Sequence, residues 1–235
     1  MAIAPTSLIP ITDGAVVLDS CGLKFNQCAV LLTGSKAYQT TSSLDPSFGY
    51  NVTVKGKVVT HQIARQFMCF DVRNYSGSIS NVKLKVYSTS LNTLNKYIIV
   101  SSSAFGGDGS KVIATEDFGT IDRNTAYSNT ETTWNTNQYN TISLLNTVTS
   151  SISESSYFTL ALIDGDFDYP LGTPVVAGDF FKGIYQSGSA HPPKLEFTSL
   201  DPGWAGGDIM GISFSNISSV NGVDIGDIDS INGIT

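Results

Sequence analysis

Apolar and polar residues alternate along much of the chain, and this pattern predicts strands. Residues 50–58 and 82–86 alternate regularly, so each segment is expected to bury one face of a strand. Residues 65–72 are apolar on much of both faces, which predicts a strand at the centre of a sheet. The other predicted strands are short apolar runs at 15–18, 27–32, 97–100, 157–163, 183–186 and 194–197.

Helical periodicity is confined to one segment. Ile142, Leu145, Val148 and Ile152 recur at helical spacing and predict one short helix. The other segments amount to about eight to ten strands with turns every eight to twelve residues or so. A parallel α/β sheet would require regular helices between its strands. We therefore expect an all-β fold, an antiparallel jelly-roll-like β-sandwich formed by residues 15–200.

Both ends of the chain are expected to extend from this domain. Residues 1–14 include Pro5 and Pro10, which exclude a helix and predict an extended N-terminal arm that can pack on a neighbouring subunit. We interpret residues 201–216 as a linker. Residues 217–235 form a separate C-terminal tail with an internal repeat.

The tail repeat consists of two matching copies, each with an Asn-Gly pair between β-branched residues. Asn-Gly is the strongest signal for a two-residue turn, so each copy predicts a tight bend between short extended segments. Burying the Ile and Val side chains of the tail would contribute about 10–20 kcal/mol. Ordering its backbone would cost about 19–38 kcal/mol. The tail therefore needs a surface, on its own domain or on another chain. The matched, predicted partner-binding residues are Ile217, Val220, Asn221, Gly222 and Val223, and Ile228, Ile231, Asn232, Gly233 and Ile234.

These paired units resemble a C-terminal tail of virion structural proteins of tailed bacteriophages, where it follows an unrelated globular domain. The resemblance covers the last nineteen residues of the chain. It implies a virion component, without indicating whether that component belongs to the capsid or to the tail of the particle.

A second resemblance concerns the fold. The segment from Tyr157 resembles the closing half of jelly-roll modules of the carbohydrate-binding and DNRLRE-like kind. It implies a sandwich whose last strand begins after a proline. The matching residues are Phe158, Leu160, Asp164, Ile184, Ser187, Pro193, Leu195 and Phe197.

Composition narrows the possible partners and location. The net charge is −7 and the basic residues form no run, which disfavours nucleic-acid binding. No apolar stretch is long enough to span a bilayer, and the first residues lack the pattern of a secretion signal. We expect assembly in a host cytoplasm and a final location in the virion. Cys21, Cys28 and Cys69 are accordingly expected to be buried, reduced thiols.

Candidate catalytic chemistry is sparse, so an enzyme is not expected. His61 and His191 lie outside any nucleophile motif. Asp164, Asp166 and Asp168 match the start of a calcium loop, but Tyr169 and Val175 stand where that loop needs Gly and Glu, so a solvated acidic turn is preferred and no metal or cofactor is expected. Sequence alone nominates no carboxylate pair for a hydrolase on this sandwich. Three tail aspartates, Asp224, Asp227 and Asp229, are expected to keep the repeat soluble.

Sugar binding is the other chemistry to consider. Trp134, Tyr139 and Tyr127, together with Phe105, lie in segments expected to be loops, where exposed rings can stack on sugars. Alternatively, these aromatic residues cap the ends of the sandwich. Our leading hypothesis is a non-enzymatic, homo-oligomeric structural protein of a phage particle, either a capsid decoration or a tail or neck accessory. The alternative is a carbohydrate-binding module for a cell-surface glycan.

Overall fold

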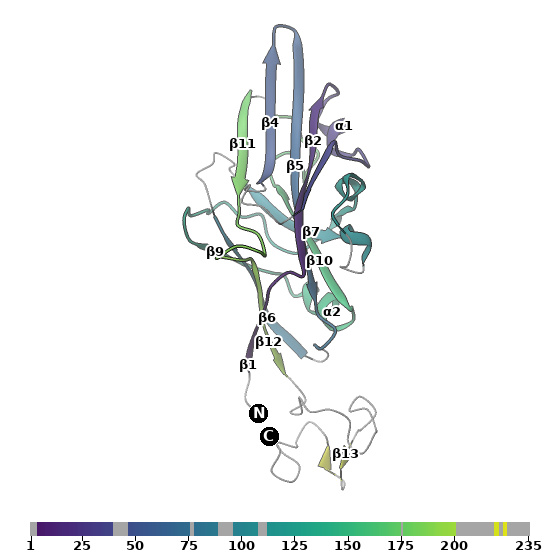
Figure 1. The fold of residues 1–235 in the computed structure, drawn as a ribbon, viewed down its shortest axis with the longest axis vertical. Coiled ribbons are helices and arrows are strands. Elements are labelled where there is room, and N and C mark those ends of the chain that lie inside the picture. Colours follow the sequence, from purple (N-terminus) through teal and green to yellow (C-terminus); the bar gives the residue numbers. More distant parts are fainter. Residues whose placement is uncertain are drawn as a thin grey trace.

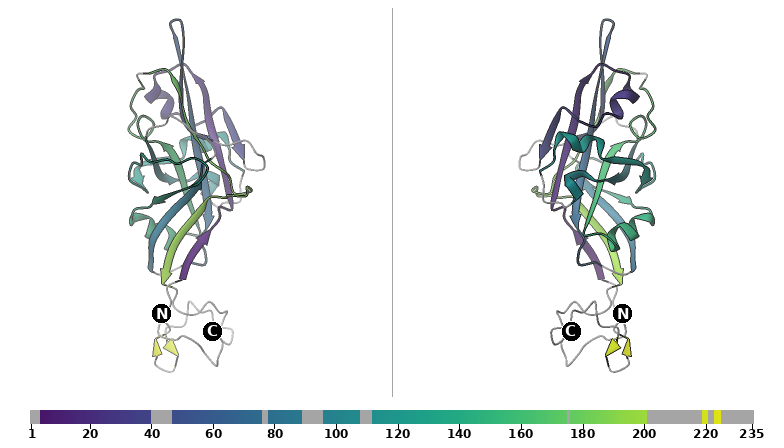
Figure 2. Two further views of the ribbon diagram at one scale, coloured as in Figure 1. Left: turned by 90° about the vertical axis from the view of Figure 1, so that its left-hand side faces the viewer. Right: turned by 90° about the vertical axis from the view of Figure 1, so that its right-hand side faces the viewer.

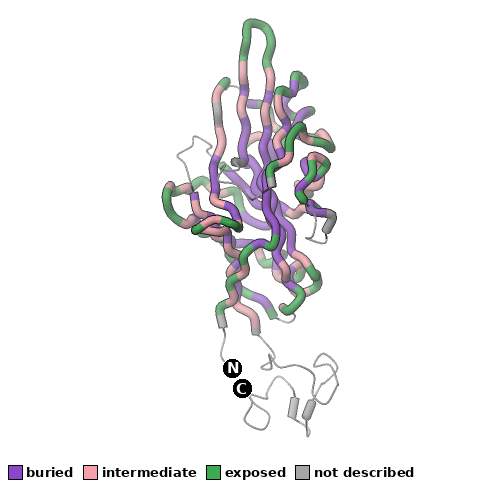
Figure 3. Tube along the Cα trace, in the orientation of Figure 1, coloured by how far each residue is buried: buried purple, intermediate pink, exposed green. Residues whose placement is uncertain are grey.

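The computed structural model describes residues 4–39, 47–75, 78–88, 96–107, 112–174 and 176–200, and two short tail strands at 219–220 and 223–224. The fold is an all-β, jelly-roll-like sandwich of two antiparallel sheets, as the alternation predicted (Figure 1). Buried hydrophobic residues from both sheets belong to one core (Figure 3). In the part of the chain that the structure describes, no helix has the length and apolar character needed to cross a membrane.

The larger sheet is organised around β5 (Val58–Asp71). One edge of β5 pairs with β2 from His61 to Cys69, while its other edge pairs first with β4 and then with β10. Its segment from Ile63 to Phe70 is almost entirely buried, so the prediction of a central strand at 65–72 is confirmed. The sheet order is β11 (Gly178–Gly183), β4 (Ser47–Lys55), β5, β10 (Tyr157–Asp164), β7 (Tyr97–Ser102) and β8 (Ile121–Ala126), with β2 (Thr12–Cys21) on β5 and β3 (Lys36–Gln39) on β2.

The smaller sheet takes in the N-terminal segment. Its order is β1 (Ala4–Leu8), β12 (Lys194–Leu200), β6 (Ser78–Tyr87) and β9 (Tyr139–Ser143). Ala4 to Leu8 pair with Ser199 to Leu195 of the same chain. The expectation that residues 1–14 form a separate arm is therefore wrong for this segment, because β1 fills an edge of its own sandwich and β2 already begins at Thr12.

Two further predictions, a single strand at 50–58 and a strand at 27–32, differ from the structure. Residues 50–58 are not one strand, since a tight turn at Gly56 (φ +63°) separates β4 from β5. Residues 27–32 are not a strand, because Phe25, Cys28 and Ala29 are buried at helical spacing in α1 (Phe25–Ala29). The Gln27 side chain accepts a hydrogen bond from the Lys24 N–H at 3.2 Å and caps this helix.

The remaining elements are short. The predicted helix around residues 142–152 is formed only in its second half, as α2 (Thr147–Ser153), because Ile142 belongs to β9. The strand predicted at 183–186 lies earlier, as β11. Two 3-10 helices, η1 (Ala104–Gly107) and η2 (Thr115–Gly119), precede β8.

In the tail, β13 (Ser219–Val220) pairs with β14 (Val223–Asp224), as expected for strands on either side of the first Asn-Gly pair. The second copy of the repeat lies outside the described residues.

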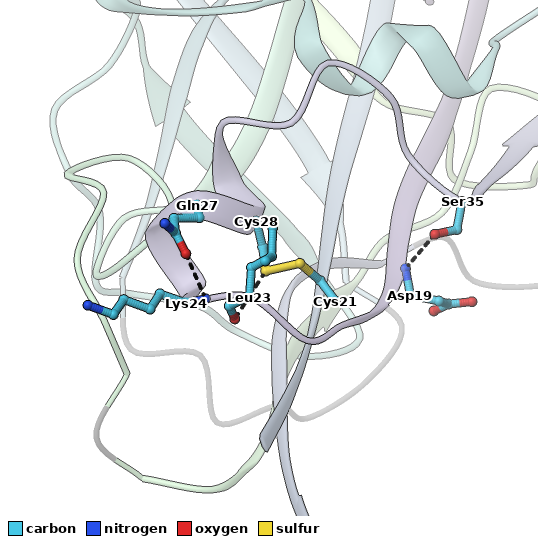
Figure 4. Close-up of a disulfide and its surroundings, with 7 residues drawn as sticks. All are labelled: Asp19, Cys21, Leu23, Lys24, Gln27, Cys28 and Ser35. Carbon is cyan, nitrogen blue, oxygen red and sulfur yellow. Dashed lines mark hydrogen bonds between the residues drawn. A yellow bond between two sulfur atoms is a disulfide. The ribbon is translucent and has the colours of Figure 1, made fainter. Parts of the chain in front are cut away.

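A disulfide closes the loop that carries α1 (Figure 4). Cys21 and Cys28 are bonded to each other, and Cys69 is buried and takes no part in a disulfide. The prediction of three reduced thiols is therefore wrong for two of them. A bridge across seven residues restricts the unfolded chain and is expected to stabilise the fold by about 2–3 kcal/mol. It ties the last turn of α1 to the end of β2.

A buried ion cluster joins the turn after β10 to the face of β5. Arg65 and Asp168 have no exposed side-chain surface, and the guanidinium Nε and Nη2 donate to the two carboxylate oxygens at 2.8 and 2.7 Å. Arg123 from β8 donates to the same carboxylate at 2.7 Å. Burial alone would raise the pKa of Asp168, but the two arginines outweigh it and hold that pKa below its usual value.

The same arginines satisfy backbone carbonyls of distant segments. Nη2 of Arg65 and Nη2 of Arg123 both donate to the carbonyl of Ala29, at 2.6 and 2.9 Å. Arg65 also donates to the carbonyl of Phe118 and lies 3.8 Å from the centroid of that ring. The cluster therefore fixes α1, η2, β8 and the turn after β10 on one central strand.

Asp168→Asn is expected to destabilise the protein by about 3–5 kcal/mol, because it leaves the buried Arg65 charge without its counterion. Urea unfolding measures this change. The matched control is Asp166→Asn in the same turn, which removes an ion pair to the half-exposed Lys96 and should cost less than about 1 kcal/mol. Equal losses for the two variants would contradict this account of the cluster.

Candidate functional site

One half-buried aromatic cluster lies where β6 ends and β9 begins. Tyr87 and Tyr139 are paired across these strands, and their rings meet edge to face with centroids 5.3 Å apart. His191, from the loop before β12, stacks on Tyr87 at 4.1 Å with an interplanar angle of 11°. Tyr185 follows β11 and contacts both Tyr87 and His191 edge to face. Four rings from four chain segments thus form one partly exposed surface.

Hydrogen bonds hold this aromatic cluster in place. The Tyr87 hydroxyl donates to the carbonyl of Asn137 at 2.6 Å, and the Tyr139 hydroxyl donates to that of Pro192 at 3.1 Å. The ammonium group of Lys194 lies 5.2 Å from the Tyr139 ring. A preorganised aromatic surface beside a cation suits a ligand with flat apolar faces and polar edges, such as a sugar.

The structure does not bring the predicted sugar-binding residues together. Tyr127 is only 5% exposed and Phe105 is fully buried, so the expectation that they present rings to solvent is wrong. Trp134 is half-buried, its Nε1 donates to Ser88 Oγ at 2.8 Å, and its ring packs on Phe48 and Tyr97. Of the predicted set, Tyr139 alone belongs to the aromatic cluster.

The acidic turn after β10 is buried, contrary to the expectation of a solvated turn. Asp164 is fully buried and accepts hydrogen bonds from the backbone N–H groups of Asp166, Phe167 and Asp168 at 3.3, 2.6 and 2.8 Å. Asp168 belongs to the ion cluster described above. Among the residues that the structure describes, no three His, Cys, Asp or Glu side chains converge as metal ligands would. The three aspartates therefore shape the turn and anchor it.

Burial, reinforced by the charge of Asp168, raises the pKa of Asp164 to about 6, although the three N–H groups oppose this shift. In the unfolded chain the pKa of this carboxyl is near 3.8. Between pH 3.8 and about 6, the folded state therefore keeps a proton on Asp164 that the unfolded chain has lost. The stabilisation that protonated Asp164 contributes is complete below the unfolded pKa of about 3.8 and is lost as the pH rises through about 6.

We therefore expect Asp164 to reduce the free energy of unfolding by on the order of 3 kcal/mol between pH 4 and 7. Asp164→Asn should lack this part of the pH dependence. Chemical denaturation at several pH values measures the slope, and NMR titration of the Asp164 carboxyl carbon should give a midpoint near 6. A midpoint at the unfolded value, with parallel profiles for the two proteins, would contradict the expectation.

A projecting hairpin is the other distinctive surface. β4 and β5 continue beyond their neighbours, because β11 stops pairing with β4 at Val52 and β2 stops pairing with β5 at His61. Residues 53–60 therefore form a two-stranded ribbon at one end of the molecule (Figures 1 and 2). Figure 3 shows that its tip is exposed.

This hairpin tip combines exposed valines with positive charge. Val54 and Val59 face each other across the strands and are 52% and 41% exposed, while Val58 is 60% exposed. Lys55 and Lys57 flank the turn, and residues 53–60 contain no acidic side chain. An isolated ribbon with exposed apolar side chains and free strand edges is a typical surface for pairing with another chain.

The two histidines lie in different surroundings. His191 belongs to the aromatic cluster, whereas His61 is 6% exposed and packs edge to face on Phe25 with centroids 5.5 Å apart. Burial lowers the pKa of His61. Its ring therefore serves as part of the packing below α1.

Comparison with known proteins leaves the family open. No family model matches the chain, and no curated protein is detectably similar to it in sequence.

Of the predicted partner-binding residues, Val220 and Val223 are paired in β13 and β14, and the others lie outside the described part of the tail. The function must therefore be argued from the aromatic cluster, the hairpin tip and the tail repeat.

Proposed function

We propose that this chain is a structural subunit of a bacteriophage particle, a capsid decoration or a tail or neck accessory, and that it acts by binding its neighbours. The observation that carries the proposal is the C-terminal repeat. It resembles a C-terminal tail of virion structural proteins, and its apolar side chains need a surface to cover them.

Two features of the body support this proposal. The sandwich has a single continuous core anchored by a buried ion cluster and a disulfide, which suits a rigid building block. The hairpin tip exposes valines at one end of that body, and exposed apolar residues on a projecting ribbon suit assembly.

The proposal predicts that the full-length chain self-associates and that a chain ending at Phe214 does so much less. Light scattering over a range of concentrations measures both masses. The expected result is an oligomer that becomes a monomer on truncation, with the unfolding transition of the body unchanged. A full-length chain that stays monomeric at high concentration, with tail amides as protected from hydrogen exchange as those of β5, would contradict the proposal.

A second candidate function is glycan recognition by the aromatic cluster, and the observation that favours it is the exposed part of the Tyr87, Tyr139, Tyr185 and His191 rings. Glycan binding is compatible with a place in a phage particle, which must contact a cell surface. Trp134 takes no part in this candidate site, because its ring packs on Phe48 and Tyr97 and its Nε1 donates to Ser88.

If the aromatic cluster binds sugar, the double variant Tyr185→Ala, His191→Ala should bind immobilised lipopolysaccharide or peptidoglycan at least about tenfold more weakly, because stacking surface is lost. Surface plasmon resonance measures the affinity. Tyr38→Ala, which removes an exposed tyrosine of β3, is the control and should bind as the parent does. Equal binding by all three proteins, or none by the parent, would reject this candidate.

A further inference from the structure

We infer that the hairpin tip, residues 53–60, is the docking site for the C-terminal repeat, residues 217–235, of a second copy of this chain. This inference rests on the proposed assembly function and names the partner. It implies head-to-tail contacts in which every copy offers a hairpin at one end and a tail from the other.

Charge complementarity is the first argument. Residues 53–60 carry Lys55 and Lys57 and no acidic residue. Residues 201–235 carry five aspartates and no Lys or Arg, and three of these, Asp224, Asp227 and Asp229, lie within the repeat. The two segments thus attract each other in a protein whose net charge of −7 makes copies repel on average.

Matching apolar surface is the second argument. Val54 and Val59 form a directly opposed pair on one face of the ribbon, and the pair two residues further in on the same face, Val52 and His61, is buried. An apolar row therefore runs from the core out along the hairpin and ends in solvent. The repeat supplies β-branched residues at regular spacing, which is the complementary half of such a contact.

Backbone pairing is the third argument. The outer edges of residues 53–55 and 58–60 extend past the last residues paired to β11 and β2. A strand added to such an edge gains main-chain hydrogen bonds, and alternate side chains then give specificity. The tail has the required extended form where it is described, because Val220 and Val223 pair in β13 and β14.

The position of the last body strand favours a neighbour over the chain's own tail. β12 ends at Leu200, at the opposite end of the body from the hairpin (Figure 1). The fourteen residues of β5 alone span about 46 Å. The connecting residues 201–216 reach at most about 58 Å when fully extended. Docking within one chain would thus require an almost straight connector along the whole body, whereas a neighbour's tail meets no such constraint.

A head-to-tail contact of this kind is heterologous, so it closes into a ring or continues as a chain of subunits. Each copy has one hairpin and one tail, and the two surfaces do not compete. Two defective copies, one lacking each surface, should consequently still form one contact between them.

The test uses three full-length variants. The hairpin variant carries Val54→Thr, Val59→Thr, Lys55→Glu and Lys57→Glu, which keep residues compatible with a strand. The tail variant carries Asp227→Lys, Asp229→Lys, Ile228→Thr and Ile231→Thr. The control carries Val112→Thr and Val176→Thr, which alter exposed valines outside the hairpin.

Light scattering should show that the hairpin and tail variants each associate at least about tenfold more weakly than the parent, and that the control matches the parent. An equal mixture of the two defective variants should give a 1:1 dimer and nothing larger. A hairpin variant that assembles like the parent, while the tail variant does not, would overturn the docking site and leave the proposed function standing. A parent chain that stays monomeric would overturn the docking site, and one whose tail amides are in addition as protected from hydrogen exchange as those of β5 would overturn the proposed function as well.

Discussion

The structure depends on one buried electrostatic contact, between Arg65 on the central strand and Asp168 in the turn after β10. Two charges without solvent exposure are tolerable only when each is paired and hydrogen-bonded. Arg123 and the carbonyls of Ala29 and Phe118 complete that pairing. Because every group of this cluster must be paired, the cluster fixes α1, η2 and β8 on β5, and the buried Cys21–Cys28 disulfide ties α1 to β2 as well. The body is consequently rigid where its irregular segments meet the sheet.

The sequence allowed the strands to be predicted wherever alternation was regular or where both faces were apolar. β6 was recognised because its side chains follow the two-residue period of a strand, and β5 and β10 because apolar residues occupy both faces. The β4–β5 turn was missed, since Val52, Val54, Gly56 and Val58 keep that period across it. A positive φ at Gly56 bends the chain, and a lone glycine between two lysines gave too weak a signal.

Contacts between distant residues could not be read from the sequence. Arg65 and Asp168 are 103 residues apart, and only the occurrence of an arginine within an apolar strand hinted at a buried partner. The disulfide was missed because three cysteines, an odd number without a close pair at metal-ligand spacing, favoured thiols. In the aromatic cluster, Tyr139 was recognised, but Tyr87, Tyr185 and His191 come from segments that only the fold brings together.

The proposed assembly function depends on the surfaces at the two ends of the sandwich. One end presents valines and lysines on a ribbon that extends past the residues paired to β11 and β2, and the chain continues from the other end into an acidic, β-branched repeat. Complementary charge and apolar surface at opposite ends are what a subunit needs to join copies of itself in a fixed direction. The aromatic cluster lies on a separate part of the molecule, so glycan binding would not compete with such assembly.

The most direct measurement is zero-length carbodiimide cross-linking of a mixture of ¹⁴N- and ¹⁵N-labelled full-length chains, read by mass spectrometry. The account predicts cross-links between Lys55 or Lys57 of one isotope and Asp224, Asp227 or Asp229 of the other. Cross-links from these lysines that join only residues of the same isotope, or that avoid the tail aspartates, would contradict it.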